Sequence, residues 1–148
     1  MKFLGQAFKK SWPDFRNIEG YDAIKDIIIR ALETDDNYNI LLVGPPASSK
    51  TLFLMGILGA YPKAKYFDAS NTTNKILDIL EERRPPIALL DELDKLPIRY
   101  HNQLLGLIES GEVKVVQQKK SYEFEIEGCK IFATANSLDK LLHGSYCG

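Results

Sequence analysis

The sequence predicts an α/β fold with a mostly parallel sheet. Three apolar runs, ILLV (40–43), IALLD (87–91) and KIFAT (130–134), have the composition of buried strands, and IALLD is apolar enough to be buried on both faces of a sheet. Segments with apolar residues at helical spacing alternate with these runs. Strands that alternate with helices in this way are typical of parallel sheets covered by helices.

The first half of the chain is expected to supply two helices and two strands. Residues 1–17 form a leader whose structure the sequence leaves open, and residues 18–148 form one domain. Over 20–33, apolar residues recur at the spacing of an amphipathic helix. After the ILLV strand, the sequence predicts a helix over 50–60 and a second strand at AKYFD (64–68).

The second half adds two helices and a hairpin. Ser70 or Asn71 is expected to cap a helix that runs to Arg83, where a Pro-Pro pair ends it. The IALLD strand follows, and then a helix over 101–110. VKVVQQKKSYEFEIEG alternates polar and apolar residues on both sides of a polar turn, which predicts a β-hairpin at 113–127 before the KIFAT strand.

Composition excludes several classes of protein. At 148 residues and 45% hydrophobic, the chain fits one globular domain, and a net charge of -1 means that nucleic-acid binding requires a local basic patch. Cys129 and Cys147 are too few for a disulfide framework, and His101 and His143 form no zinc-ligand cluster. These features suit a reducing cytoplasm. No signal peptide and no apolar run of about 18 residues is present.

The stretch GPPASSKT (44–51) has the features of a phosphate-binding loop. It follows a buried strand, consists of small residues, and places Lys50 at the start of a helix. In the motif G-x-x-x-x-G-K-[ST], backbone N–H groups and the helix N-terminus face a phosphate, the lysine reaches the β- and γ-phosphates, and the Thr51 hydroxyl binds Mg²⁺. Ser49 replaces the second glycine of the motif, so an ordinary strand–turn–helix connection is an alternative for the loop alone.

Two further strands end in polar residues. The IALLD strand ends in Asp91, and Glu92 comes next, on the edge where open α/β sheets bind ligands. There Asp91 can hold the Mg²⁺ shell and Glu92 can polarise the water that attacks the γ-phosphate. Asn136 follows KIFAT and can contact that water or the γ-phosphate. Taken singly, the Asp-Glu pair is also typical of a solvated turn, and Asn136 of the start of a turn.

Together these residues resemble the AAA+ ATPases. GPPASSKT stands in the place of the Walker A loop of that family (usually GPPGTGKT), LLDELDK matches its Walker B segment, and ATAN is similar to its sensor 1. NIEGYDAIKDII resembles the segment that lies beside the adenine. QLLGLIESGEV with the hairpin at 113–127 is similar to the helix and hairpin that precede sensor 1 in helicase, branch-migration and MoxR-type members. The resemblance covers about residues 17–142.

The resemblance implies an ATPase that binds ATP with Mg²⁺ and assembles into a ring. Glu92 would activate water, Asn136 would sense the γ-phosphate, and Thr51 and Asp91 would position the metal. Ile18 to Tyr21 would line the adenine. Asn71 would restrain Glu92 until a ligand arrives, although a helix cap explains it equally well. The nucleotide would be held by Gly44, Pro45, Pro46, Ala47, Ser48, Ser49, Lys50, Thr51, Leu52 and Asp91.

Two departures from the family pattern carry expectations of their own. Ala47 and Ser49 replace glycines, and a non-glycine residue at positive φ costs about 1 kcal/mol or more. Family members also continue past sensor 1 to an arginine finger, a fifth strand and a helical lid, whereas this chain ends at Gly148. We therefore interpret it as a truncated ATPase core, with the ILLV strand on an exposed edge and a rate about 10³-fold or more below that of a complete site.

Three functions follow from these residues. The first is a ring motor acting on DNA, such as a helicase or branch-migration engine, which Lys114, Lys119 and Lys120 of the hairpin would bring to phosphates. A solvated hairpin turn explains the same lysines. The second is a MoxR-like ATPase that remodels proteins. The third is a nucleotide-binding module with little or no hydrolysis. Tyr122 and Phe124 would stack on bases or pack onto the domain.

Overall fold

The computed structural model describes residues 13–36, 38–71, 75–110, 112–116, 121–125 and 128–146. In chain order its elements are α2 (Asp22–Glu33), β1 (Ile40–Val43), α3 (Lys50–Ala60), β2 (Lys65–Asp68), α4 (Lys75–Arg83), β3 (Ile87–Asp91), the 3₁₀ turns η1 (Leu93–Lys95) and η2 (Ile98–Tyr100), α5 (His101–Ser110), β4 (Glu112–Val116), β5 (Ser121–Glu125), β6 (Lys130–Ala135) and α6 (Leu138–Tyr146). The predicted α/β fold is confirmed at this level.

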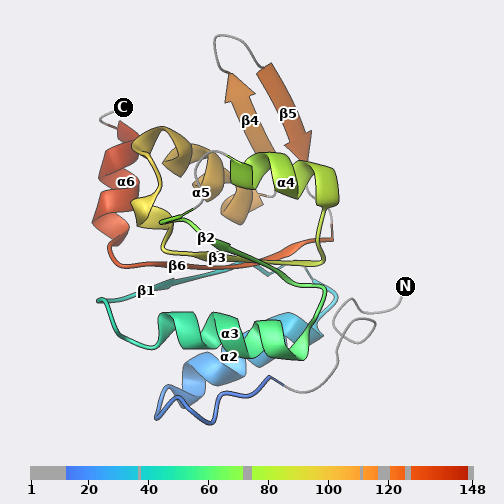
Figure 1. Cartoon of the computed structure of the whole chain (residues 1–148), viewed down its shortest axis with the longest axis vertical. Helices are drawn as coiled ribbons and strands as arrows, with labels where there is room; N and C mark the ends of the chain where they lie inside the picture. Colours follow the sequence, from blue (N-terminus) through green and yellow to red (C-terminus); the bar gives the residue numbers. More distant parts are fainter. Residues whose placement is uncertain are drawn as a thin grey trace.

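Four of the strands form one parallel sheet in the order β1-β6-β3-β2 (Figure 1). All three ladders are parallel, so the carboxyl ends of the four strands meet at one edge of the sheet. Strands β4 and β5 form a separate antiparallel pair, which confirms the predicted hairpin. This pair extends away from the sheet beyond α5 (Figure 1).

Helices cover both faces of the parallel sheet. In Figure 1, α2 and α3 lie below it, and α4, α5 and α6 lie above it. Side chains alternate between the two faces along β3, where Leu89 packs with α2 and α3 while Leu90 packs with α4 and α5. Every residue of β3 and of β6 is therefore buried, which explains their nearly continuous apolar sequence.

Strand β1 lies at an edge of the parallel sheet, as the sequence predicts for ILLV. It pairs with β6 on one side, through a register that joins Val43 to Ala135. Val43 is 45% exposed, and the other three residues of β1 are half-buried. On its outer side, β1 pairs with none of the described strands, so the backbone groups of that side take no part in the sheet.

One helix is new, and the expected cap at Ser70 or Asn71 stays a prediction. The helix before β3 is described from Lys75, and residues 72–74, where a cap would be seen, lie outside the described residues. The side chains of Ser70 and Asn71 both donate hydrogen bonds to Asp68. Helix α6 is an element that the sequence reading did not include. The hydroxyl of Ser137, just before α6, accepts a hydrogen bond from the Lys140 N–H at 3.2 Å, as an N-terminal cap does.

The segment before α2 packs onto α3. Phe15, inside the stretch assigned to a leader, is 6% exposed, and its ring meets that of Phe53 edge to face at 5.3 Å. A Cβ on Gly56 would lie 2.7 Å from the Phe15 ring, so only glycine allows this approach. Within the described part of the chain, every helix is too short or too polar to cross a bilayer.

Candidate functional site: a loop and carboxylate cleft at the carboxyl edge of the sheet

A cleft of about 280 Å³ opens where β1, β3 and β6 end. The loop after β1, the acidic end of β3 and the polar end of β6 meet here because their strands are parallel neighbours. Its walls are Pro46, Ala47, Ser48, Ser49, Lys50, Thr51, Leu52, Asp91, Glu92, Thr134 and Asn136. The structure thus brings the three predicted polar segments to one cavity.

The loop between β1 and α3 has the backbone that the sequence predicts for its two replaced glycines. Ala47 has φ 61° and Ser49 has φ 70°, both in the left-handed region. Non-glycine residues in this region cost about 1–3 kcal/mol each. At Gly44 a Cβ would lie 3.2 Å from the Ser48 hydroxyl oxygen, so a larger residue there would require that side chain to move slightly. The fold therefore holds this loop in a strained, compact shape.

Lys50 is the first residue of α3, and its side chain turns back over the loop. Its Nζ donates hydrogen bonds to the carbonyl oxygens of Gly44 at 2.7 Å and Pro45 at 2.6 Å, and to the Ser48 hydroxyl at 2.9 Å. All three acceptors are uncharged, so none of them balances the charge of the ammonium group. A phosphate at the start of α3 would supply that opposite charge.

Asp91 is the buried centre of the cleft wall, with 4% of its surface exposed. Its Oδ2 accepts a hydrogen bond from the Thr51 hydroxyl at 2.9 Å, and its Oδ1 accepts one from the Thr134 hydroxyl. Thr51 comes from the first turn of α3, and Thr134 lies beside Asp91 in β6, because Leu90 pairs with Ala133. Asp91 therefore ties the loop helix to both central strands.

Tyr66 is a member of this cluster that the sequence reading missed. Its hydroxyl donates to Asp91 Oδ2 at 2.7 Å from the neighbouring strand β2. Burial, and then the hydrogen bond to Asp91, raise the pKa of Tyr66 above its ordinary value, so the phenol keeps its proton and stays a donor. An aromatic residue in an alternating strand reads as a core residue, and only the strand register brings it to Asp91.

Glu92 leaves β3 with an unusual backbone. Its φ is 59°, and its N–H donates to the Thr134 hydroxyl at 2.9 Å. Its carboxylate lines the cleft and forms a 3.0 Å ion pair with Lys95, one turn further along the chain. The hydrogen bond and charge of Glu92 raise the pKa of Lys95. In this structure the partner of Glu92 is Lys95, whereas Asn71 bonds to Asp68, so Asn71 does not restrain Glu92 here.

Asn136 also lines the cleft, directly after β6, the strand between β1 and β3. Its backbone N–H donates to Asp94 Oδ1 at 3.2 Å, and Asp94 is 4% exposed. This bond links the segment after β3 to the segment after β6, across the two strands. Asp94 therefore positions Asn136, a role that the sequence reading did not assign.

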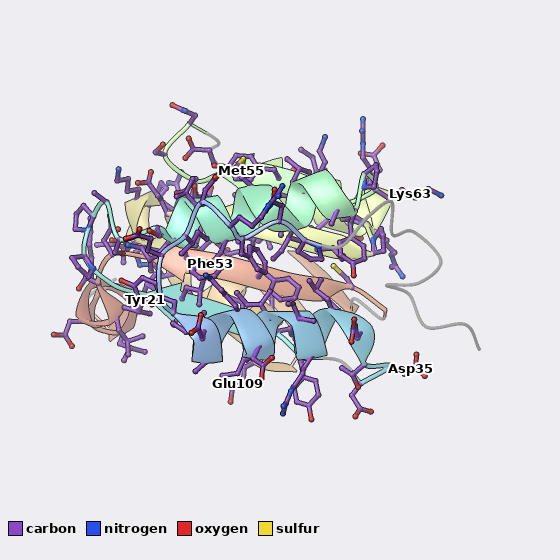
Figure 2. The ribbon with its side chains drawn as sticks, turned by 90° about the horizontal axis from the view of Figure 1, so that it is seen from below. Tyr21, Asp35, Phe53, Met55, Lys63 and Glu109 are labelled. Atoms are coloured by element: carbon purple, nitrogen blue, oxygen red, sulfur yellow. The ribbon has the colours of Figure 1, made fainter. Side chains whose placement is uncertain are left out.

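A second hollow of about 290 Å³ adjoins the cleft, since Leu52 lines both. Ile18, Gly56 and Ala60 also line it. Tyr21 lies elsewhere, in a hollow of about 180 Å³ beneath the loop, with its ring edge to face with Phe53 at 6.3 Å (Figure 2). The structure thus separates Ile18 from Tyr21, which the sequence reading grouped beside one base.

The hairpin carries the three lysines that the sequence analysis assigns to nucleic-acid contacts, Lys114, Lys119 and Lys120. Lys119 and Lys120 lie outside the described residues, and for Lys114 the structure describes the backbone of β4. The same holds for Tyr122 and Phe124 in β5. What the structure does give is the antiparallel pairing of β4 with β5 and its projection from the body (Figure 1).

The donor set at the cleft fits a hard cation. The Thr51 hydroxyl and the Asp91 carboxylate, 2.9 Å apart, offer oxygen ligands, and Mg²⁺ prefers oxygen. Within the described ranges, no three His, Cys, Asp or Glu residues gather as a metal cage. Such a cage is not needed by Mg²⁺, which commonly binds through one or two carboxylates together with substrate phosphates and water.

No protein-family model and no curated protein matches this chain. The residues of the cleft provide a strained loop of small residues at a helix N-terminus, a lysine over that loop, and a buried carboxylate joined to the first turn of the helix.

Proposed function

We propose that this chain is an AAA+-type P-loop core that binds ATP with Mg²⁺ and hydrolyses it. The observation that carries the proposal is the loop backbone. Ala47 and Ser49 adopt positive φ where glycines would adopt it without cost, between the parallel edge strand β1 and a helix that begins with Lys50. Strain of this kind persists where the surrounding structure and a ligand require the conformation, so it supports a phosphate-binding role.

The triphosphate is proposed to lie along the loop, at the N-terminus of α3. There the backbone N–H groups of the first turn have no partners within the helix and attract anions. Lys50 would exchange the carbonyls of Gly44 and Pro45 for phosphate oxygens, which carry the negative charge that those carbonyls lack. The nucleoside would continue past Leu52 into the hollow that Ile18 lines.

Hydrolysis is proposed to use the two acids at the end of β3. Bound Mg²⁺ would neutralise charge on the β- and γ-phosphates. Asp91 would face the metal next to Thr51, and Glu92 would take a proton from the attacking water once it leaves Lys95. Glu92 and Lys95 are 29% and 45% exposed at their side chains, so water screens their attraction and the exchange is accessible.

For the polymer on which such an ATPase would act, we favour nucleic acid. The β4–β5 hairpin projects from the body, and its segment carries Lys114, Lys119 and Lys120. In a ring of copies, these lysines would repeat around a pore and meet phosphates. Stimulation of ATP turnover by single- or double-stranded DNA, lost in Lys119→Glu/Lys120→Glu, is the expected result; stimulation by a protein client alone would favour remodelling instead.

A titration calorimetry series tests the binding proposal. Wild-type protein is titrated with ATPγS in Mg²⁺, in parallel with Lys50→Ala and with Lys63→Ala as a matched control. Lys63 lies beyond the far end of α3 from the loop (Figure 2). We expect wild type and Lys63→Ala to bind ATPγS with the same affinity. In Lys50→Ala the affinity should fall at least about tenfold, roughly 1.4 kcal/mol. Absence of binding by the wild type would reject the function.

A further inference from the structure

The hydroxyl of Tyr66 has no part in the phosphate chemistry proposed above, yet it contacts the central carboxylate. Asp91 Oδ2 receives two hydrogen bonds, from Tyr66 at 2.7 Å and from Thr51 at 2.9 Å. Its Oδ1 receives one from Thr134. An ionised carboxylate has about four acceptor positions, so three hydroxyls leave about one for another partner.

The strand register explains how Tyr66 reaches Asp91. Tyr66 pairs with Leu89 in the parallel ladder, and Asp91 lies two residues further along β3. Since side chains alternate along a strand, Leu89 and Asp91 point to the same face of the sheet. Leu89 packs in the cluster beneath α3, with Tyr66 against it, so this is the face on which Thr51 lies. Tyr66 approaches Asp91 diagonally on that face, from the strand on the side away from Thr134.

This arrangement fixes the direction of the carboxylate. Tyr66 from β2 and Thr134 from β6 approach from the two flanking strands, and Thr51 approaches from α3. A carboxylate held by three donors cannot rotate freely, and this one lines the cleft. Partners behind a metal ligand orient it in the same way, and their loss typically lowers metal affinity about 10–100-fold.

We propose that Tyr66 is a positioning residue that holds Asp91 for the divalent cation of the bound nucleotide. The proposal rests on the proposed function, because it gives Asp91 the cation that the nucleotide brings. Tyr66 itself touches neither the cation nor the phosphates. Its removal is therefore expected to weaken the binding of the cation while leaving the contacts between the loop and the phosphates in place.

The test compares Tyr66→Phe with Tyr61→Phe, which removes a hydroxyl from a buried tyrosine of the same apolar cluster away from the cleft. Binding of Mn²⁺ to the ADP complex is measured by electron paramagnetic resonance, and ADP binding in EDTA is measured by calorimetry. We expect Tyr66→Phe to weaken Mn²⁺ binding about tenfold or more, with ADP affinity in EDTA within about twofold of wild type. Tyr61→Phe is expected to leave both unchanged.

The failures can be told apart. Unchanged or tighter Mn²⁺ binding in Tyr66→Phe, with ADP bound normally, would overturn the role of Tyr66 alone. An equal loss of ADP affinity with and without the metal would also overturn it, since it would show a structural role. If the wild type binds no ADP in either buffer, the proposed function fails and the inference with it. If Tyr66→Phe does not fold, Tyr66→His is compared with Tyr66→Leu, because histidine keeps a ring donor and leucine has none. Equal Mn²⁺ affinities of these two variants would overturn the role.

Discussion

The hydroxyl of Thr51 donates to the carboxylate of Asp91 at 2.9 Å, although 40 residues of chain separate them. One lies at the start of the helix after β1, and the other at the end of β3, with β6 between these strands in the sheet. Their contact joins the loop to the acidic strand end. Through this contact the phosphate-loop segment and the acidic end of β3 line the same cleft.

Glu92→Gln is expected to abolish ATP turnover while leaving nucleotide affinity within about threefold. The amide keeps the shape of the side chain but cannot accept a proton from water, and such bases contribute roughly 10²–10⁴ in rate. Phosphate release under saturating ATP is the measurement. Glu109→Gln is the control, because Glu109 lies far from the cleft. The carbonyl of the preceding residue, Ile108, accepts a hydrogen bond from Asn39, which lies just before β1, at the amino end of that strand. Turnover that survives in Glu92→Gln would contradict the assignment.

Ser49→Gly is expected to change nucleotide affinity by less than about tenfold, roughly 1.4 kcal/mol. Ser49 already has φ 70°, so the loop shape does not depend on glycine. Glycine would remove strain of about 1 kcal/mol but would add freedom to the unfolded chain, so a small net change in stability follows. Calorimetry on Ser49→Gly and Ala47→Gly checks this. Nucleotide binding that appears only after glycine is restored would show that the native loop does not bind.

Lys130→Met is expected to lower the free energy of unfolding by about 2–3 kcal/mol, since it removes charged hydrogen bonds from buried carbonyls. Lys130 is 3% exposed, and its Nζ donates to the carbonyl oxygens of Ala31 at 2.7 Å, of Leu32 at 3.3 Å and of Thr34. These bonds close the C-terminus of α2 onto β6. Urea unfolding is the measurement, with the exposed Lys140→Met as control. A loss below about 0.5 kcal/mol would disprove the capping role.

Cys129 is expected to make stability fall at alkaline pH. Burial raises the pKa of its thiol from 9.0 to about 12. Above pH 9 the unfolded chain loses the proton while the native protein keeps it, so this contribution is complete below pH 9 and is lost as the pH rises toward 12. Between about pH 8.5 and 10.5, the wild type should lose roughly 2 kcal/mol more than Cys129→Ala. The measurement is the free energy of unfolding of both proteins as a function of pH. An equal loss in wild type and in Cys129→Ala would exclude the effect.

Much of the fold was predictable because buried strands and helix faces require apolar residues at regular positions in the sequence. Strands β3 and β6 are covered on both faces, so their residues are nearly all apolar, and their positions were predicted. The expected cap at Ser70 or Asn71 stays a prediction, because residues 72–74 lie outside the described residues, although both side chains donate to Asp68 at the end of β2. Helix α6 had a signal, since Ser137 precedes leucines at helical spacing.

The candidate site divides in the same way. Lys50, Asp91 and Asn136 follow buried strands or open a helix, and such positions are visible in the sequence. Tyr66 and Thr134 lie inside strands, where a tyrosine and a threonine are ordinary, and only the register of three strands brings them to Asp91. The separation of Ile18 from Tyr21 follows from the packing of the first segment onto α3, which no local pattern encodes.

The most direct test of the nucleotide site is an amide NMR titration of the chain with ADP and Mg²⁺. The loop residues 47–51 line the cleft with Asp91 and Asn136, so their N–H signals are expected to shift most, followed by those of residues 91–92 and 134–136. Lys50→Ala should reduce these shifts at the same ligand concentration. Shifts centred elsewhere on the fold, or no shifts at millimolar ADP, would contradict the account.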